Sequence, residues 1–187
     1  MHSFGSGVDG LEPAAGLLAD KAGNFYGTTS YGGSYGTVQS AGLGTVFKIA
    51  PDGTEKVLHS FGNGTDGAVP AASLIAGQGR VTSTAPRWAG GAYAASSGGY
   101  GGTVFKIAPD GTETVLYSFT GGADGSIPSS SLLLDAADNL YGTAQRGGIG
   151  GSGGNGNGVV FKLAPNGTET VLYAFTGGSD GCLPSAT

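Results

Sequence analysis

One stretch of this sequence occurs three times, and that repeat limits the possible folds more than any other feature. The stretch GTVFKIAPDGTETVLYSF at Gly102–Phe119 recurs with few changes at Gly44–Phe61 and at Gly158–Phe175. The three copies begin 58 and then 56 residues apart. A period of this size indicates a repeat architecture, in which each unit is one supersecondary element that packs against its neighbours.

The repeated stretch has the pattern of a β-hairpin. TVFKI and ETVLYSF are short runs of β-branched and aromatic residues, and the APDGT between them has a proline, an aspartate and a glycine suited to a tight turn. In the second run, Val115 and Tyr117 alternate with Leu116, which is the period of a strand. Each copy therefore predicts two antiparallel strands.

A second hairpin follows each copy. After the loop TGGADGSIP come SLLLD, a short turn and NLYGTA, so that one unit carries four short strands. Four-stranded antiparallel units in series are typical of β-propeller blades. We predict an all-β, β-propeller-like fold, with an open β-solenoid as the alternative.

The repeat predicts one domain over residues 1–187. Its parts are a half blade, two blades and a half blade, at 1–43, 44–101, 102–157 and 158–187. This amounts to about three blades, whereas closed propellers have about 4 to 8, so we expect a fragment of a larger propeller or array. The strands at 159–175 could pair with those at 14–33, but blade faces would stay exposed. We therefore expect the chain to self-associate through open blade edges or to remain partly molten.

The segment at 78–89, QGRVTSTAPRWA, differs in composition from the rest of the repeat. It stands where other units have NFYGTTSYG or NLYGTAQRG. We read the codons that can encode this segment in a shifted frame, in which the third base of each codon is joined to the first two bases of the next. The shifted codons can then encode Asn-Leu-Tyr-Gly-Thr-Thr. We interpret the segment as a frameshifted strand, from a sequence error or a decayed gene. Pro86 and the charged Arg80 and Arg87 predict that it pairs poorly.

The pattern GTVFKLxPDGTxTVLYSFTGGxDGxxPxxxLxxDxxGNLYGTTxxGG resembles the GloVer-type tandem repeat of bacterial proteins that carry varied C-terminal cell-surface anchors. The matching segments are Gly102–Gly148, Gly44–Leu74, Asp9–Gly33 and Gly158–Pro184. The resemblance implies a propeller-like module that is exported and displayed on a bacterial cell surface. It implies no reaction.

Composition argues against several classes of partner. The net charge is -5 and the sequence has no basic stripe, which disfavours nucleic acid. No apolar run approaches the ~20 residues of a membrane-spanning helix, so we expect no membrane insertion. Cys182 is the single cysteine, which precludes an internal disulfide and makes a small loop residue its favoured role.

Four aspartates recur in the xDGxxP loops and are the first candidates for a site: Asp9, Asp66, Asp124 and Asp180. An acidic loop residue can ligate Ca²⁺, but that ion takes six to eight oxygens and each loop brings one carboxylate. We favour a role in capping the loop as an Asx-turn. The loop GGIGGSGGNGNG at 147–158 lacks aspartates at ligand positions and fits an inter-blade loop.

The remaining polar candidates also follow the repeat. His2 and His59 hold the position of Tyr117 and Tyr173, which predicts a ring that packs edge-on and reaches a polar partner. A glutamate follows each hairpin turn and is expected to face solvent; these residues are Glu55, Glu113 and Glu169. Glu12 breaks the repeat, and the sequons at Asn63 and Asn166 fit turns better than glycosylation. We predict no catalytic, cofactor-binding or metal site.

Two classes of function fit this pattern. The favoured one is a non-enzymatic module whose inter-blade loops, Tyr31–Ala41 and Tyr93–Gly101, contact a glycan or a surface protein. The alternative is a fragment of a propeller-type glycosidase or lyase. That alternative needs two asymmetric carboxylates, or a carboxylate and a cation, converging in one central cleft.

Overall fold

The computed structural model describes residues 2–5, 8–13, 15–35, 42–62, 65–70, 72–77, 80–85, 101–149 and 156–185. These residues form antiparallel strands joined by turns and loops, which confirms the all-β prediction. Within these ranges, no helix is long and apolar enough to span a membrane.

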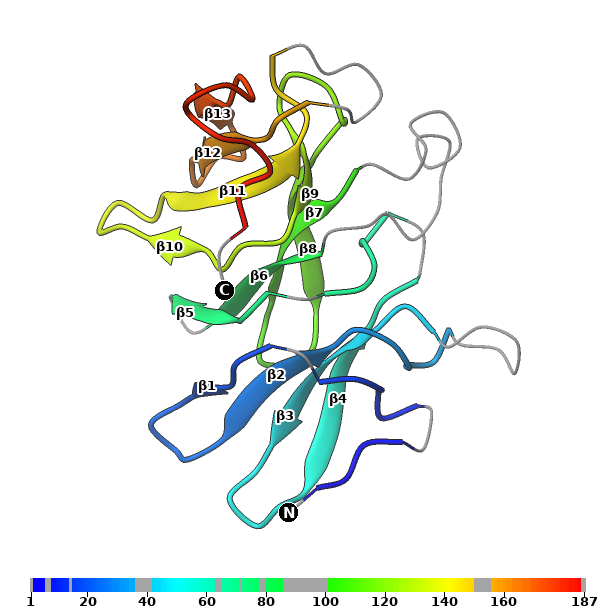
Figure 1. Cartoon of the computed structure of the whole chain (residues 1–187). Coiled ribbons are helices and arrows are strands. Elements are labelled where there is room, and N and C mark those ends of the chain that lie inside the picture. Colours follow the sequence, from blue (N-terminus) through cyan, green and yellow to red (C-terminus); the bar gives the residue numbers. More distant parts are fainter. Residues whose placement is uncertain are drawn as a thin grey trace.

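The strands form three sheets that follow one another along the chain (Figure 1). The first blade holds β1 (Leu18–Ala19), β2 (Phe25–Thr29), β3 (Thr45–Ile49) and β4 (Glu55–Ser60). The second blade holds β5 (Ile75–Gly77), β6 (Arg80–Ala85), β7 (Thr103–Ile107) and β8 (Glu113–Ser118). The third blade holds β10 (Leu133–Leu134), β11 (Leu140–Arg146), β12 (Val159–Leu163) and β13 (Glu169–Ala174), with β9 (Ser126–Pro128) beside β11.

The predicted blade boundaries are wrong by half a unit. Each sheet combines the second hairpin of one unit with the first hairpin of the next, because β2 pairs with β3 from Phe25↔Ile49 to Thr29↔Thr45. The chain therefore forms three complete four-stranded blades instead of two blades and two halves. The sequence repeat is the same whether a blade begins with the first or with the second hairpin of a unit. It therefore does not indicate which loop crosses from one sheet to the next. In the structure, the xDGxxP loop is the crossing.

The prediction that the foreign segment pairs poorly is wrong for residues 80–85. β6 is an inner strand that pairs with β5 on one side and with β7 on the other, from Val81↔Ile107 to Ala85↔Thr103. The ladder uses backbone groups, which every residue except proline supplies, and valine and threonine favour strands. The rest of the segment, at 78–79 and 86–89, lies outside the described residues. The frameshift itself stays a prediction.

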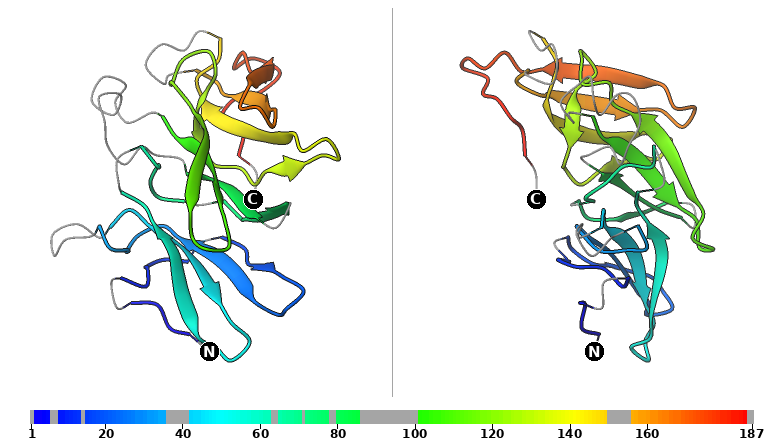
Figure 2. Two further views of the ribbon diagram at one scale, coloured as in Figure 1. Left: turned by 180° about the vertical axis from the view of Figure 1, so that it is seen from behind. Right: turned by 90° about the vertical axis from the view of Figure 1, so that its right-hand side faces the viewer.

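The blades lie in a row (Figure 2). The hydrophobic core lies between them, because each cluster of buried apolar residues combines side chains of two consecutive blades. We call each interface between consecutive blades a junction. In the first junction Phe61 of the first blade packs on Phe105 of the second, with ring centroids 5.0 Å apart. In the second junction Phe119 packs on Phe161, also at 5.0 Å. All four rings are buried.

The glycine in the tyrosine-glycine-threonine sequence of the inner strands β2 and β11 follows from this packing. A Cβ built on Gly27 would lie 2.5 Å from the ring of Phe47, and one on Gly142 would lie 2.8 Å from that of Phe161. Contacts this short are not tolerated, so Gly27 and Gly142 leave the room that the facing phenylalanine rings occupy. In the second blade Ser83 holds this register position, opposite Phe105.

Candidate functional site

The xDGxxP aspartates close the loops in which they lie. Asp124 accepts hydrogen bonds from Thr120 N at 2.7 Å, from Thr120 Oγ1 at 2.6 Å and from Gly122 N at 3.2 Å. Asp180 accepts the same two bonds from Thr176, and Asp66 accepts one from Gly62 N at 3.1 Å. The expected capping role holds, but its form differs from an Asx-turn, because these bonds run back to earlier residues. Asx-turns occur instead in the hairpin turns, for example at Asp110 with Thr112 N at 2.9 Å.

A ring from the outer strand reaches each of these aspartates. Tyr117 donates to Asp124 Oδ2 at 3.1 Å, and His59 Nε2 lies 3.2 Å from Asp66 Oδ2. Both rings pack edge-on against the phenylalanine two residues later, with interplanar angles of 80°. Burial, and then the Asp124 carboxylate, raise the pKa of Tyr117. The predicted ring with a polar partner is confirmed, and His2 with Asp9 repeats it at 3.4 Å.

The residue before the proline of each xDGxxP loop has a left-handed backbone. The φ angles are 56° at Glu12, 55° at Val69, 54° at Ile127 and 53° at Leu183. For β-branched residues this conformation is rare and costs about 1–3 kcal/mol. A backbone bond holds it, as from Val69 N to Leu43 O at 2.7 Å. Glu12 departs from the repeat in its side chain and keeps the shared backbone conformation.

The prediction that the three hairpin glutamates face solvent is wrong. Glu55, Glu113 and Glu169 are partly buried, and one carboxylate oxygen of each is buried without a hydrogen-bond partner. The reason is that the hairpin turns of the second and third blades pack on the outer strand of the preceding blade, while His2 and Asp9 lie near Glu55 on the first blade. At Gly111, for example, an added Cβ would lie 2.5 Å from Leu58 O. Burial raises the pKa of Glu113 and of Glu169 to about 7.

These groups form a junction cluster, which we define as one ring, one aspartate and one glutamate at the same junction. Glu113 lines a hollow of about 310 Å³ together with His59, Thr65, Asp66 and Val115. After burial, the nearby His59 lowers the pKa of Glu113 and the nearby Asp66 raises it. A carboxyl group that titrates near neutral pH beside a His–Asp pair can accept or donate a proton.

The same three groups recur at the second junction, around Glu169, and on the first blade, around Glu55. The pKa of Glu55 is raised by burial, lowered by His2 and raised by Asp9. Burial and then Asp124 raise the pKa of Glu169. Sequence reasoning missed these clusters, because it treated the glutamates and the aspartates as separate series; their common signal is the recurrence of both in every unit. Among the described residues, no three His, Cys, Asp or Glu side chains are grouped so that they could hold a metal ion.

A second aspartate network supports the inner hairpins. Asp135 accepts hydrogen bonds from Ala137 N, Asn139 N, Asn139 Nδ2 and Tyr141 OH at 2.8–2.9 Å, and its bonds to Asn139 lower its pKa to about 2. Lys162 lies 5.9 Å from the centroid of the Tyr141 ring. The first blade repeats this network around Asp20. The sequence signal for this network is the motif DxxxNxY, which occurs at Asp20–Tyr26 and at Asp135–Tyr141.

The second blade lacks the residues for this network, since Gly77 and Thr82 stand at the aspartate and tyrosine positions. Lys106 there lines a hollow of about 200 Å³ between the second and third blades, along with Asp138, Leu134 and Leu140.

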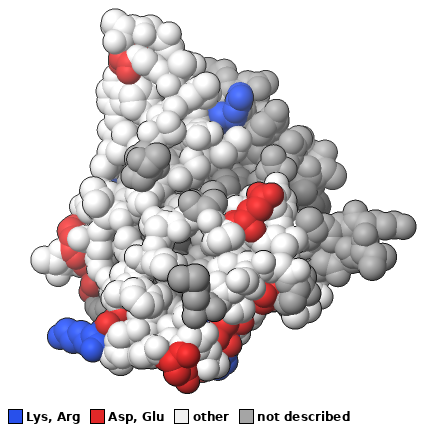
Figure 3. All heavy atoms as spheres, turned by 60° about the horizontal axis from the view of Figure 1, so that its bottom comes forward, with Lys and Arg blue, Asp and Glu red and all other residues white. Residues whose placement is uncertain are grey.

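The loop surface carries exposed tyrosines. Tyr31 and Tyr35, in the loop after β2, are 36% and 48% exposed. The other predicted binding loop, at 93–101, lies outside the described residues except for Gly101. Figure 3 shows acidic and basic side chains scattered over a mostly uncharged face.

In fold, the chain is similar to a gluconolactonase from Xanthomonas campestris, with a TM-score of 0.51 and 14% identity over 91% of this chain and 48% of that one. It is also similar to a luciferin-regenerating enzyme, with a TM-score of 0.48 and 13% identity over 86% of this chain and 45% of that one. The chain spans about half the length of these structures. No curated protein is similar to it in sequence.

The gluconolactonase likeness concerns the fold alone, and it agrees with propeller-like blades. In sequence, residues 1–187 match the Gloeobacter/Verrucomicrobia repeat. This match agrees with the recurrence of the hairpin three times and of the aspartate loop four times. The chain belongs to the Gloeobacter/Verrucomicrobia repeat family.

Proposed function

We propose that this chain is a non-enzymatic repeat module of an exported bacterial cell-surface protein, in which stacked blades display loops that bind a glycan or another protein. The observation that carries this proposal is the repetition of the reactive groups. The same ring–aspartate pair occurs at Tyr117 with Asp124 and at Tyr173 with Asp180, and each aspartate also closes its own loop. Because these ring–aspartate pairs recur from unit to unit and hold the loops in place, we assign them a structural role.

The loops supply the binding surface in this proposal. Tyr31 and Tyr35 are exposed and lie four positions apart in one loop, whose start is anchored by the antiparallel bridge between Leu11 and Tyr31. An anchored aromatic ring can stack on the apolar face of a sugar or on a partner side chain at low entropic cost. Export to the cell surface rests on the family resemblance.

The test is binding of the purified chain to an array of glycans and to insoluble polysaccharides. We expect binding that falls about 5-fold or more in Tyr35→Ala and is retained in Tyr35→Phe, which keeps the ring. The same samples are assayed for released reducing ends and for unsaturated products, and none is expected. Turnover of a polysaccharide, or binding that is equal in both variants, would contradict the proposal.

A glycosidase or lyase is the second candidate, because of the cluster of His59, Asp66 and Glu113. These three residues line a hollow of about 310 Å³. Of the two hollows described above, it is the one that brings a histidine and an aspartate together with a glutamate whose pKa is raised to about 7. If this cluster is catalytic, Glu113→Gln abolishes turnover, whereas Glu169→Gln at the equivalent position does not. The recurrence of the cluster ranks this candidate second.

A further inference from the structure

The first and third blades each expose a face whose equivalents are buried inside the chain. On the first blade Leu17 is 59% exposed, whereas the equivalent Leu74 and Leu132 are 4% and 2% exposed. On the third blade Leu172 is 51% exposed, whereas the equivalent Leu116 is partly buried in the second junction. These two faces are the two halves of an interface that the chain already builds twice.

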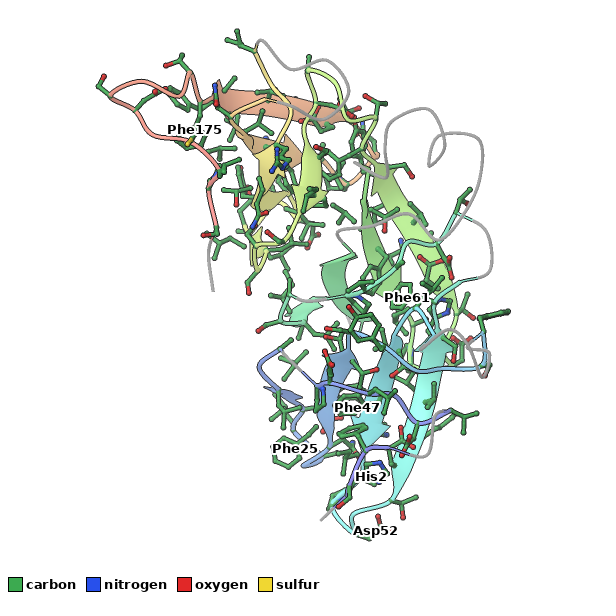
Figure 4. The ribbon with its side chains drawn as sticks, turned by 45° about the vertical axis from the view of Figure 1, so that its right-hand side comes forward. His2, Phe25, Phe47, Asp52, Phe61 and Phe175 are labelled. Atoms are coloured by element: carbon green, nitrogen blue, oxygen red, sulfur yellow. The ribbon has the colours of Figure 1, made fainter. Side chains whose placement is uncertain are left out.

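The aromatic rings show how the halves fit. Phe61 and Phe119 end the outer strands of their blades, and each packs on a phenylalanine of the following blade. Phe175 is the equivalent residue of the third blade, and the ring that it contacts among the described residues is Tyr173 of the same blade. Figure 4 shows Phe175 and Phe25 at opposite ends of the row of blades. The matching ring on a first blade is Phe47.

In this chain Phe47 already has a partner. Residues 4–13 have the same place in the repeat as residues 175–184, and Phe4 packs on Phe47 with centroids 4.8 Å apart. The segment continues along the first blade, where Leu11 N donates to Tyr31 O at 2.8 Å and Tyr31 N donates to Leu11 O at 3.1 Å. Residues 4–13 thus occupy the position that the end of a preceding blade would take.

We propose that a second copy of this chain docks on the first blade, with its residues 175–184 replacing residues 4–13. The same exchange at the other end joins the third blade of the first copy to the first blade of the second copy. The interface is heterologous, and two copies of three blades close a ring of about six, inside the known range of propellers. Cys182 of one copy then takes the place of Leu11, directly opposite Tyr31 of the other.

This geometry permits a cross-linking test, because Cys182 is exposed and is the one cysteine of the sequence. Opposite residues that exchange two backbone hydrogen bonds have Cα atoms about 5.5 Å apart, which suits a disulfide. In Tyr31→Cys, mild oxidation should give a covalent dimer on a non-reducing gel. Adding Cys182→Ser should abolish that dimer.

The matched control is a variant in which residues 4–13 are held on the first blade of their own chain, so that no second copy can replace them. The variant Leu11→Cys/Tyr31→Cys/Cys182→Ser should form a disulfide within one chain and stay monomeric in light scattering at every concentration. Without oxidation, Phe175→Ala should weaken dimerisation by about 100-fold, and Phe4→Ala should strengthen it.

Two results would overturn the proposal. The first is a Tyr31→Cys chain that stays monomeric and uncrosslinked at hundreds of micromolar, while the control forms its internal disulfide and so shows that the geometry is suitable. The second is a ladder of covalent trimers and higher multiples, which would mean an open array in place of a two-copy ring.

Discussion

Raising the pH from 5 to 8 should destabilise this protein through its junction glutamates, and Glu169 gives the clearest test. The ring beside it is Tyr117, whereas the rings of the other two clusters are histidines, which can themselves carry a charge. Burial and Asp124 raise the pKa of Glu169 from 4.5 to about 7. Since the folded pKa lies above the unfolded one, the folded state binds more protons between these values. The stabilisation is complete below pH 4.5 and is lost as the pH rises through 7.

The magnitude follows from the shift in the pKa of Glu169. A shift of about 2.5 units corresponds to about 3.4 kcal/mol of unfolding free energy for a fully buried group. The Glu169 side chain is partly exposed, so solvent screening reduces this to about 1.5 kcal/mol. For a chain of this length, that corresponds to about 3–6 °C in Tm.

The assay is urea unfolding of the wild type, Glu169→Gln and Glu12→Gln at pH 5 and pH 8. The loss of unfolding free energy between the two pH values should be about 1.5 kcal/mol smaller in Glu169→Gln than in the wild type. Glu12→Gln, at an exposed loop residue, should match the wild type. Equal losses in all three proteins would refute the assignment of a buried, protonated carboxyl group to this junction.

Four further predictions follow from the scaffold. Asp124→Asn should lower the free energy of unfolding by about 1–2 kcal/mol in urea, because charged hydrogen bonds close its loop; an unchanged midpoint would contradict the capping role. Gly142→Ser should lower the unfolding free energy by about 1–3 kcal/mol, and an unchanged unfolding free energy would contradict the packing argument. Resequencing the DNA for residues 78–89 should reveal the Asn-Leu-Tyr-Gly-Thr-Thr reading in the shifted frame, and its absence would end the frameshift hypothesis. The purified chain should turn over no common polysaccharide; turnover that disappears in Glu12→Gln would contradict this expectation.

The sequence was enough to predict the strands and their hairpins, because local patterns determine both. The alternation of Val115, Leu116 and Tyr117 and the APDGT turn identify one hairpin without reference to the rest of the chain. It could not determine which hairpins share a sheet. The pairing of β2 with β3 is made across a loop of about 15 residues, and nothing local distinguishes that loop from the xDGxxP crossing.

The candidate site shows the same division between local and distant contacts. Tyr117 and Asp124 are seven residues apart, and their hydrogen bond could be anticipated from their recurrence. The burial of Glu113 could not be anticipated, because its surroundings include His59 and Asp66, which come from an earlier unit of the chain. A strand-start glutamate after a turn ordinarily faces solvent, and here the stacking of blades overrides that tendency.

The placement of the core between blades has a consequence for how the molecule opens. Each blade alone is a thin sheet with little apolar interior. The free energy of unfolding therefore comes mainly from the interfaces between neighbouring blades, and it is approximately a sum of such nearest-neighbour terms along the chain. Only the second blade is coupled on both sides within this chain. In the monomer, amide hydrogen exchange should therefore be slowest in β7 and faster in β2 and β12, with the terminal blades opening as separate cooperative units before the centre does.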